Sequence, residues 1–323
     1  MPNLNTGQLL QAYRRMKTIR EFEERLHVEI ATGKIAGFTH LYAGQEAIAV
    51  GVCEHLSEED SIISTHRGHG HCIAKGADVL MMMKEIWGST EGTCKGKGGS
   101  MHLAEIDRGI LGANGIVGGG PPIAVGAALA SKLKNNNTVA VSFGGDGSSN
   151  QGTTFEAMNM AVCLKVPKVF VMENNGYSEN TGASYSSGGI DTAARAEGFG
   201  MPVFKADGSD FFSVYEAAGN AIEHARSGKG PSVVYAQMMR YYGHFEGDPQ
   251  LYRAKGEVEE LRETSDCLNK FRATTTSQGS LESAALDSVD DEVLALIEES
   301  VQASMAAPRG TPADVTTDVY INY

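Results

Sequence analysis

The stretch that decides the fold is TVAVSFGGDGSSNQGTTFEAMNMAVCLKVPKVFVMENNGY, residues 138–177. Its two apolar runs, 138–143 and 168–173, predict buried strands, and the segment 154–164 between them predicts a helix. A strand, a crossover helix and a second strand within 40 residues are typical of a parallel pair in an α/β sheet.

Polar motifs follow both predicted strands directly. Gly145-Asp146-Gly147 comes after the first strand, and Asn174-Asn175 comes after the second. Because parallel strands end at the same edge of a sheet, we expect both motifs there, where open α/β sheets bind ligands. A glycine-aspartate-glycine triplet alone is a common turn, but the pair of motifs after two strands favours a site.

The residue types at this edge suit a magnesium ion. Mg²⁺ prefers oxygen ligands, few of them from protein, with phosphate and water completing an octahedron. Asp146 offers a carboxylate, Asn175 an amide oxygen and Tyr177 a backbone carbonyl. Gly145 and Gly147 allow the backbone to approach a diphosphate, and we expect the free N–H groups at Ser148, Ser149 and the following helix start to hold it.

Working outward, strands and helices alternate to about residue 240, which predicts an α/β protein with a central, mostly parallel sheet flanked by helices. The further predicted helices are 6–33, 45–55, 77–88, 121–134 and 212–226, and the further strands are 61–65, 202–205 and 232–238. We expect a single domain over 1–323, composed of N-terminal helices (1–60), the α/β core (about 61–240), a helical C-terminal part (about 254–305) and a tail (306–323).

Three segments are less regular. A loop rich in histidine and glycine is expected after residue 65, and the end of the tail is expected to dock in an extended form. Segment 91–122 holds so much glycine that it is either a flexible linker or a backbone passing close to a ligand. Its apolar residues favour the second interpretation.

Charge and cysteine content exclude several classes of partner. The net charge is −13, and an acidic surface repels nucleic acid and anionic lipid. The five cysteines are scattered, which argues against a disulfide framework and for a reducing compartment. The N-terminus does not look like a signal peptide, and no stretch of about 18 apolar residues is present. We therefore expect a cytoplasmic protein that binds neither nucleic acid nor membrane.

Beyond the two strand-end motifs, much of the chain resembles a known family. The motifs on which the resemblance rests are HLYAGQEA (40–47), GKGGSMH (96–102), NGIVG (114–118), NQGTTFEAMNMA (150–161), ENNGY (173–177) and RYYGHFEGDPQLYR (240–253). Together they resemble the α subunits of thiamine-diphosphate-dependent 2-oxo-acid dehydrogenase E1 components. The resemblance implies a thiamine-diphosphate-binding fold, thiamine diphosphate and Mg²⁺ as cofactors, and Asp146, Asn175 and the Tyr177 carbonyl as metal ligands.

The same resemblance assigns residues to the cofactor pocket. Gly115 and Val117 would line the cofactor centre, although Val117 could instead pack in the core. Arg67 would meet the diphosphate, although it could instead form an exposed salt bridge. His244 would be an active-site histidine whose imidazole hydrogen-bonds the phosphate of the cofactor or transfers protons near pH 7, and His40 would be a second catalytic histidine of the pocket.

His66 invites two interpretations. It stands where the pyruvate enzymes typically carry tyrosine, and we expect it to be a catalytic hydrogen-bond donor beside a hydroxyketone. It also begins a cluster, His66, His69 and His71, that could be read as a zinc site, but ligand-spaced carboxylates are missing nearby. Phe245 and Glu246 follow His244 where animal pyruvate enzymes carry a regulatory serine, so that form of control is not expected.

These differences from the pyruvate enzymes, at His66 and after His244, combine with the closing TDVYINY (317–323). In this combination the chain most closely resembles acetoin dehydrogenase α subunits. This resemblance implies cleavage of acetoin to acetaldehyde, with a hydroxyethyl unit oxidised and passed as acetyl to a lipoyl-bearing E2. It also implies a β subunit in an α2β2 heterotetramer, which supplies the activating glutamate. Pyruvate or a branched 2-oxo acid is the alternative substrate. The rivals are an NAD-binding oxidoreductase, disfavoured because no G-x-G-x-x-G follows a first strand, and a non-catalytic cofactor-holding subunit.

Overall fold

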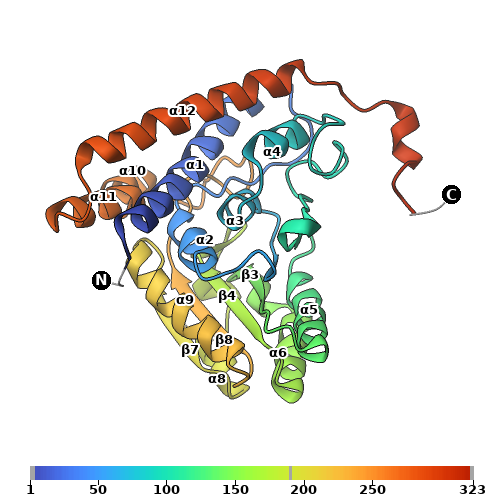
Figure 1. The fold of residues 1–323 in the computed structure, drawn as a ribbon, viewed down its shortest axis with the longest axis vertical. Coiled ribbons are helices and arrows are strands. Elements are labelled where there is room, and N and C mark those ends of the chain that lie inside the picture. The colour runs from blue at the N-terminus through green and yellow to red at the C-terminus, as the bar shows by residue number, and fades with distance from the viewer. Residues whose placement is uncertain (1–3, 189–190, 321–323) are drawn as a thin grey trace.

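A computed structural model describes residues 4–188 and 191–320 of the chain (Figure 1). At its centre is a six-stranded sheet in the order β2-β1-β3-β4-β8-β7, with every neighbouring pair parallel. Its strands are β1 Ser61–Ile63, β2 Ile110–Gly112, β3 Ala140–Gly145, β4 Lys168–Asn174, β7 Val203–Asp207 and β8 Ser232–Gln237. A separate two-stranded hairpin joins β5 Tyr177–Ser178 to β6 Thr181–Gly182.

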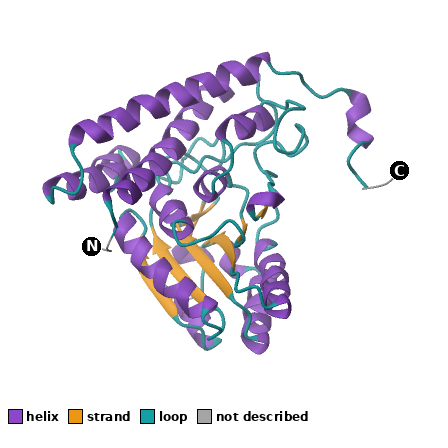
Figure 2. Cartoon of the chain, viewed as in Figure 1, coloured by secondary structure: helices purple, strands orange, loops and turns teal. Residues whose placement is uncertain are grey.

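Side chains that alternate along each strand bury the sheet on both faces. In β4, Val169 and Val171 join one core cluster, while Phe170 and Met172 join another. The helices α5 Gly120–Lys134, α6 Gly152–Leu164 and α8 Ala193–Gly198 contribute to the second cluster. Helices α2 Glu46–Cys53 and α9 Phe211–Arg226 contribute to the first. Helices thus cover both faces of the sheet (Figure 2), as a parallel sheet requires.

An outer helical layer buries its apolar side chains in the first cluster. The long helices α1 Thr6–Ala31 and α12 Ser283–Ala306 pack together, and α12 also packs on α4 Val79–Ile86 (Figure 1). In α12 the buried stripe is Val289, Val293, Ile297 and Val301, while Leu296 is 38% exposed and lies outside it. The remaining helical segments are α3 His69–Lys75, α7 Ala183–Ser186, α10 Glu257–Thr264, α11 Cys267–Ser277 and the 3-10 turns η1 Ile106–Arg108, η2 Ser148–Asn150 and η3 Pro312–Thr316.

The predicted α/β fold class, with its mostly parallel sheet and helical additions at both ends, is confirmed. The predicted strands and helices are present with boundaries shifted by one or two residues at most ends. No helix of the described part of the chain is long and apolar enough to cross a membrane. The division of the chain into one domain with four named parts stays a prediction.

Two predictions about irregular segments are wrong. The histidine-rich loop after β1 contains helix α3, which buries His69 and His71 and ends at Gly76, whose positive φ closes the last turn. The tail does not dock in an extended form, because η3 interrupts it and Val315 and Val319 stay 74% and 60% exposed. Residues 321–323 lie outside the described part.

The glycine-rich segment is an ordered loop, and one buried carboxylate organises its first part. Glu85, at the end of α4, is fully buried and accepts hydrogen bonds of 2.8–3.1 Å from four backbone N–H groups, those of Cys94, Gly96, Gly98 and Gly99. Charge-assisted bonds of this kind offset the entropy that glycine loses on ordering. The linker interpretation is therefore wrong.

We predict that Glu85→Gln destabilises the protein by about 3 kcal/mol or more, because the new amide group would face two N–H donors and leave them unpaired. Urea unfolding of the wild type and variant measures the difference. Glu91→Gln is the control, since that carboxylate is 51% exposed and its pairing with Lys84 is worth under about 1 kcal/mol. Equal losses for the two variants would contradict the role assigned to Glu85.

Candidate functional site

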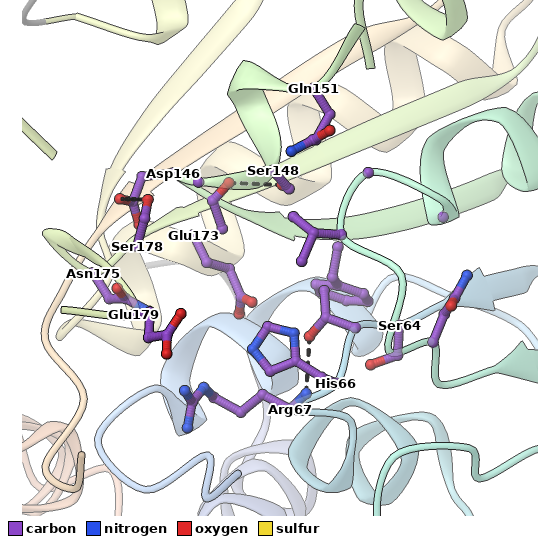
Figure 3. A pocket seen from close by; sticks show the side chains of 18 of the residues that line it. Ser64, His66, Arg67, Asp146, Ser148, Gln151, Glu173, Asn175, Ser178 and Glu179 are labelled. Atoms are coloured by element: carbon purple, nitrogen blue, oxygen red, sulfur yellow. Dashed lines mark hydrogen bonds between the residues drawn. The ribbon is translucent and has the colours of Figure 1, made fainter. Parts of the chain in front are cut away.

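The carboxyl edge of the sheet opens into a cavity of about 290 Å³. Much of its lining comes from segments that follow strands: Thr65 to Arg67 after β1, Asn114 and Ile116 to Gly118 after β2, Asp146 after β3, Asn175 after β4 and Arg240 after β8. Figure 3 shows Asp146, Asn175 and Ser178 on one side of it, His66 and Arg67 on another, and Glu173 between them. Parallel strand order therefore brings together residues that are distant in sequence.

The predicted metal ligands meet at one end of this cavity. Asp146 is 3% exposed, and its carboxylate accepts one side-chain hydrogen bond, from Ser178 at 3.1 Å. The Arg240 guanidinium reaches both other oxygens, the Tyr177 carbonyl at 3.2 Å and Asn175 Oδ1 at 3.5 Å. Burial raises the pKa of the Asp146 carboxyl above its ordinary value. A cation beside it would offset that cost.

Two buried arginines flank the cavity. Arg67 is 4% exposed and donates to the backbone carbonyls of Leu41 and His244. Burial, with Arg240 second, lowers the pKa of Arg67 to about 9. Arg240 is fully buried and donates to carbonyls and to the Tyr252 hydroxyl. Neither arginine forms an ion pair within residues 4–188 and 191–320, so the alternative of an exposed salt bridge for Arg67 is wrong.

This charge pattern tests the expected cofactor. A buried carboxylate without a cation within 4 Å lies beside two buried guanidinium groups without anions, among the residues that the structure describes. Isolated buried charges are costly, so each set needs a partner from outside the chain. A divalent cation suits Asp146, and a diphosphate suits the arginines. The residues fit a magnesium–diphosphate group.

Three histidines form a cluster beside Arg67. The ring centroids of His40 and His66 are 4.6 Å apart, those of His40 and His244 4.9 Å, and those of His66 and His244 5.2 Å. Burial, with Arg67 second, lowers the pKa of His40 to about 3, of His66 to about 2 and of His244 to about 4. All three imidazoles are therefore neutral at pH 7, able to donate or accept a hydrogen bond.

The zinc alternative at His66, His69 and His71 is not supported by the geometry. His69 contacts Glu23 at 3.0 Å and Ser100 at 2.9 Å, deep in the core. His71 contacts Ser64 at 2.7 Å and Glu173 at 3.1 Å, in a different network. The three side chains thus lie in three separate environments and do not form one metal site.

Most predicted site residues line the cavity, and two do not. The lining set includes His66, Arg67, Val117, Gly145, Asp146, Gly147, Ser148, Asn175, Tyr177 and His244. His40 lies behind His66 and His244, and Gly115 lies near His102, so neither lines the wall. Val117 is 46% exposed, so core packing is the wrong interpretation for it. Roles in binding or catalysis stay predictions for all of these residues.

The local backbone explains the glycine and serine choices only in part. A Cβ on Gly147 would come within 2.5 Å of Ser178 Oγ, so this position requires glycine for close approach. Gly145 has room for a Cβ, because the nearest atom would be 3.8 Å away. The Ser148 hydroxyl donates to the Gly145 carbonyl at 2.7 Å, and the Ser149 N–H donates to the Asp146 carbonyl. The Ser149 N–H is thus engaged within the turn, not available to a phosphate.

Sequence reasoning missed three charged residues of the cavity wall, the buried Arg240 and Glu173 and the exposed Glu179. Arg240 lies three residues after β8, and its position at a strand end was the signal that could have found it. Glu173 directly precedes the asparagine pair and lies within β4. The alternation of side chains along a strand does not reveal that this carboxylate points into the cavity. Its carboxylate accepts from the Tyr42 hydroxyl and contacts His71, which fixes the side chain at 4% exposure.

Fold and site together define an α/β protein whose sheet-edge cavity suits a divalent cation and a diphosphate. Residues 14–313 match the family described as dehydrogenase E1 component. The chain belongs to this family, whose members are thiamine-diphosphate-dependent oxidoreductases. The predicted resemblance is confirmed.

Individual relatives cover nearly the whole chain. The α subunit of acetoin:2,6-dichlorophenolindophenol oxidoreductase from Cupriavidus necator is 52% identical over 320 residues, which are 99% of this chain and 96% of the relative. The Bacillus subtilis subunit of the same name is 48% identical over 321 residues, again 99% and 96%. The pyruvate dehydrogenase E1 component subunit alpha of Rhizobium meliloti is 38% identical over 312 residues, 97% and 90%.

We predict that the histidine cluster makes stability depend on pH. Unfolded histidines take up protons near pH 6.5, whereas folded His66 and His244 do so near pH 2 and pH 4. The unfolded chain therefore binds more protons below pH 6.5, and stability falls as the pH drops from 6.5 towards 4. Thermal unfolding midpoints across this range should fall less steeply for His66→Gln than for the wild type. Parallel slopes would show that His66 does not contribute to this pH dependence.

Proposed function

We propose that this chain is the α subunit of an E1 enzyme that cleaves acetoin to acetaldehyde and transfers the remaining two-carbon unit, as acetyl, to lipoyl-E2. The observation that supports this proposal is that the buried Asp146 carboxylate and the Asn175 and Tyr177 oxygens lie together at one end of the cavity, beside Arg67 and Arg240. When bound, thiamine diphosphate supplies the electron sink for carbon–carbon cleavage.

The chain's own residues would hold that cofactor by charge. Asp146, Asn175 and the Tyr177 carbonyl would hold Mg²⁺, and Arg240 would turn from these oxygens towards the diphosphate. Arg67 already points into the cavity with its guanidinium buried, so it meets a phosphate at little cost in side-chain entropy. Val117 and Ile116 would provide apolar contact for the rings, since both are exposed on the cavity wall.

Acetoin is favoured over a 2-oxo acid by two features. The relatives named for acetoin are 52% and 48% identical, against 38% for the pyruvate relative. His66 also places a neutral imidazole at the cavity wall, and a hydrogen bond from it to a hydroxyketone oxygen needs no counter-charge. The pyruvate or branched-chain alternative rests on the more distant relatives, and a substrate panel on the purified α and β pair separates the two.

The position after His244 offers no site for the kinase control of animal pyruvate enzymes. The Phe245 ring stacks edge-on against Phe38 at 5.7 Å, and Glu246 pairs with His27 at 2.8 Å. These contacts hold the segment to the N-terminal region of the chain. The proposed function therefore does not include regulation of this kind.

A second subunit completes the proposed enzyme. Val117 is 46% and Ile116 72% exposed at the mouth of the cavity, so the wall that would enclose the cofactor rings is incomplete in this chain. A β subunit that covers these residues and supplies the activating glutamate would close it. The subunit names of the relatives, which print alpha, support this arrangement, and we extend it to an α2β2 heterotetramer in the cytoplasm.

Asp146→Ala should lower the affinity of the assembled α and β subunits for thiamine diphosphate by more than about 100-fold in saturating Mg²⁺, since the only anionic metal ligand is lost. Isothermal titration calorimetry measures the change. Asp287→Ala is the control, because that carboxylate is 64% exposed on α12. Unchanged affinity in Asp146→Ala would overturn the assignment of the metal site.

His66→Tyr should lower the ratio of kcat/KM for acetoin to that for pyruvate by roughly 10-fold or more, because the imidazole donor beside the hydroxyketone is lost. Steady-state kinetics with both substrates on the reconstituted pair gives the ratio. His102→Tyr, at an exposed loop histidine, controls for general effects of the added ring. An unchanged ratio would remove His66 from substrate selection.

A further inference from the structure

We propose that His40, His66 and His244 form a binding site for a divalent transition ion of the zinc type, separate from the magnesium site. One ligand nitrogen from each side chain lies within 4.8 Å of the other two. In a tetrahedral zinc site with Zn–N bonds of about 2.0 Å, the ligand nitrogens are about 3.3 Å apart. Side-chain rotations that move each nitrogen by roughly 1 Å would bring the three nitrogens to this spacing.

The three imidazoles have the free nitrogens that a metal needs. None of their side chains makes a hydrogen bond within the described ranges 4–188 and 191–320. His40 is 8% exposed, and its Nδ1 is buried without a partner. The other buried histidines differ, since His69 and His71 each have both ring nitrogens engaged. A buried nitrogen without a partner costs free energy that a bound ion would recover.

The ligand type selects a zinc-like ion over magnesium. Imidazole nitrogens suit Zn²⁺, Cu²⁺ and Ni²⁺, whereas Mg²⁺ demands oxygen ligands. Three histidines also leave a fourth position open to water, as in catalytic zinc sites. Arg67 opposes any cation at this position, being one residue from His66, so binding should be favoured when a diphosphate neutralises that guanidinium. The oxygen site at Asp146 and the nitrogen site are thus chemically distinct.

Such an ion would inhibit the enzyme, a consequence that rests on the proposed function. His66 and His244 face the cavity, and coordination would take up the nitrogens that donate to or protonate the substrate. Inhibition would be reversible and would not displace magnesium. The site therefore makes activity responsive to the free concentration of zinc.

The test uses the reconstituted α and β pair with thiamine diphosphate and saturating Mg²⁺, and Co²⁺ as a spectroscopic probe. We expect one Co²⁺ per α chain with the visible absorption of a nitrogen-rich site, displaced by Zn²⁺. His66→Gln should weaken Co²⁺ binding on the order of 100-fold. The matched control His224→Gln, at the far end of α9, should bind as the wild type does. Zn²⁺ should reduce acetoin turnover at the concentration at which it displaces Co²⁺.

Three results would overturn the proposal: no Co²⁺ absorption, equal binding by wild type and His66→Gln, or a Co²⁺ spectrum of a site that has oxygen ligands alone, which would place the ion at the oxygen site. Pulsed electron paramagnetic resonance of the unmodified pair loaded with Cu²⁺ counts coordinated imidazoles without any variant, and fewer than two would also overturn it. Calorimetry of thiamine diphosphate on the same samples tests the proposed function separately, so that cofactor binding without Co²⁺ binding rejects only this site.

Discussion

The site depends on the register between β3 and β4. Gly145 lies opposite Glu173 in the parallel ladder, so the residues that follow the two strands, Asp146 and Asn175, emerge side by side. A shift of one residue would turn every side chain of β4 to the opposite face of the sheet. That shift would exchange Val169 and Val171 with Phe170 and Met172, which pack in different clusters. The two cores therefore fix the register that assembles the ligands.

Charge balance is the second constraint on the cavity. A protein of net charge −13 has placed Arg67 and Arg240 in its interior without carboxylate partners among the described residues. The arrangement is costly in isolation and makes sense for a chain that binds a polyphosphate and a metal together. Free energy of ligand binding then compensates for the unpaired charges, and the apo protein should be less stable than the loaded one. Burial keeps the pKa values of His40 and His66 low, and Arg67 lowers them further because its charge opposes protonation.

The sequence predicts the sheet and its ligand edge well, because both depend on local periodicity. The runs TVAVSF and KVFVME contribute to the two central strands, β3 and β4, and polar residues that follow them line the cavity. Prediction fails where the determinant is not local. Helix α3 forms because His69 and His71 have buried partners, Glu23 and Glu173, far away in the chain. No periodicity in STHRGHGHCIAKG carries that information.

Arg240 is a second case in which the sequence alone does not reveal the role of a residue. The family resemblance points to His244 four residues later, because a histidine has recognised chemistry, while an arginine in a loop is usually solvated. Only the cavity shows that this guanidinium is fully buried and reaches Asn175 and Tyr177. Its guanidinium lies within 3.5 Å of the two oxygens, Asn175 Oδ1 and the Tyr177 carbonyl, that would hold the proposed cation. The proposed metal would therefore displace it, and the diphosphate of the proposed cofactor is the anion to which it would move. Cation and diphosphate should for this reason bind as a pair, each removing the electrostatic cost that the other would face alone.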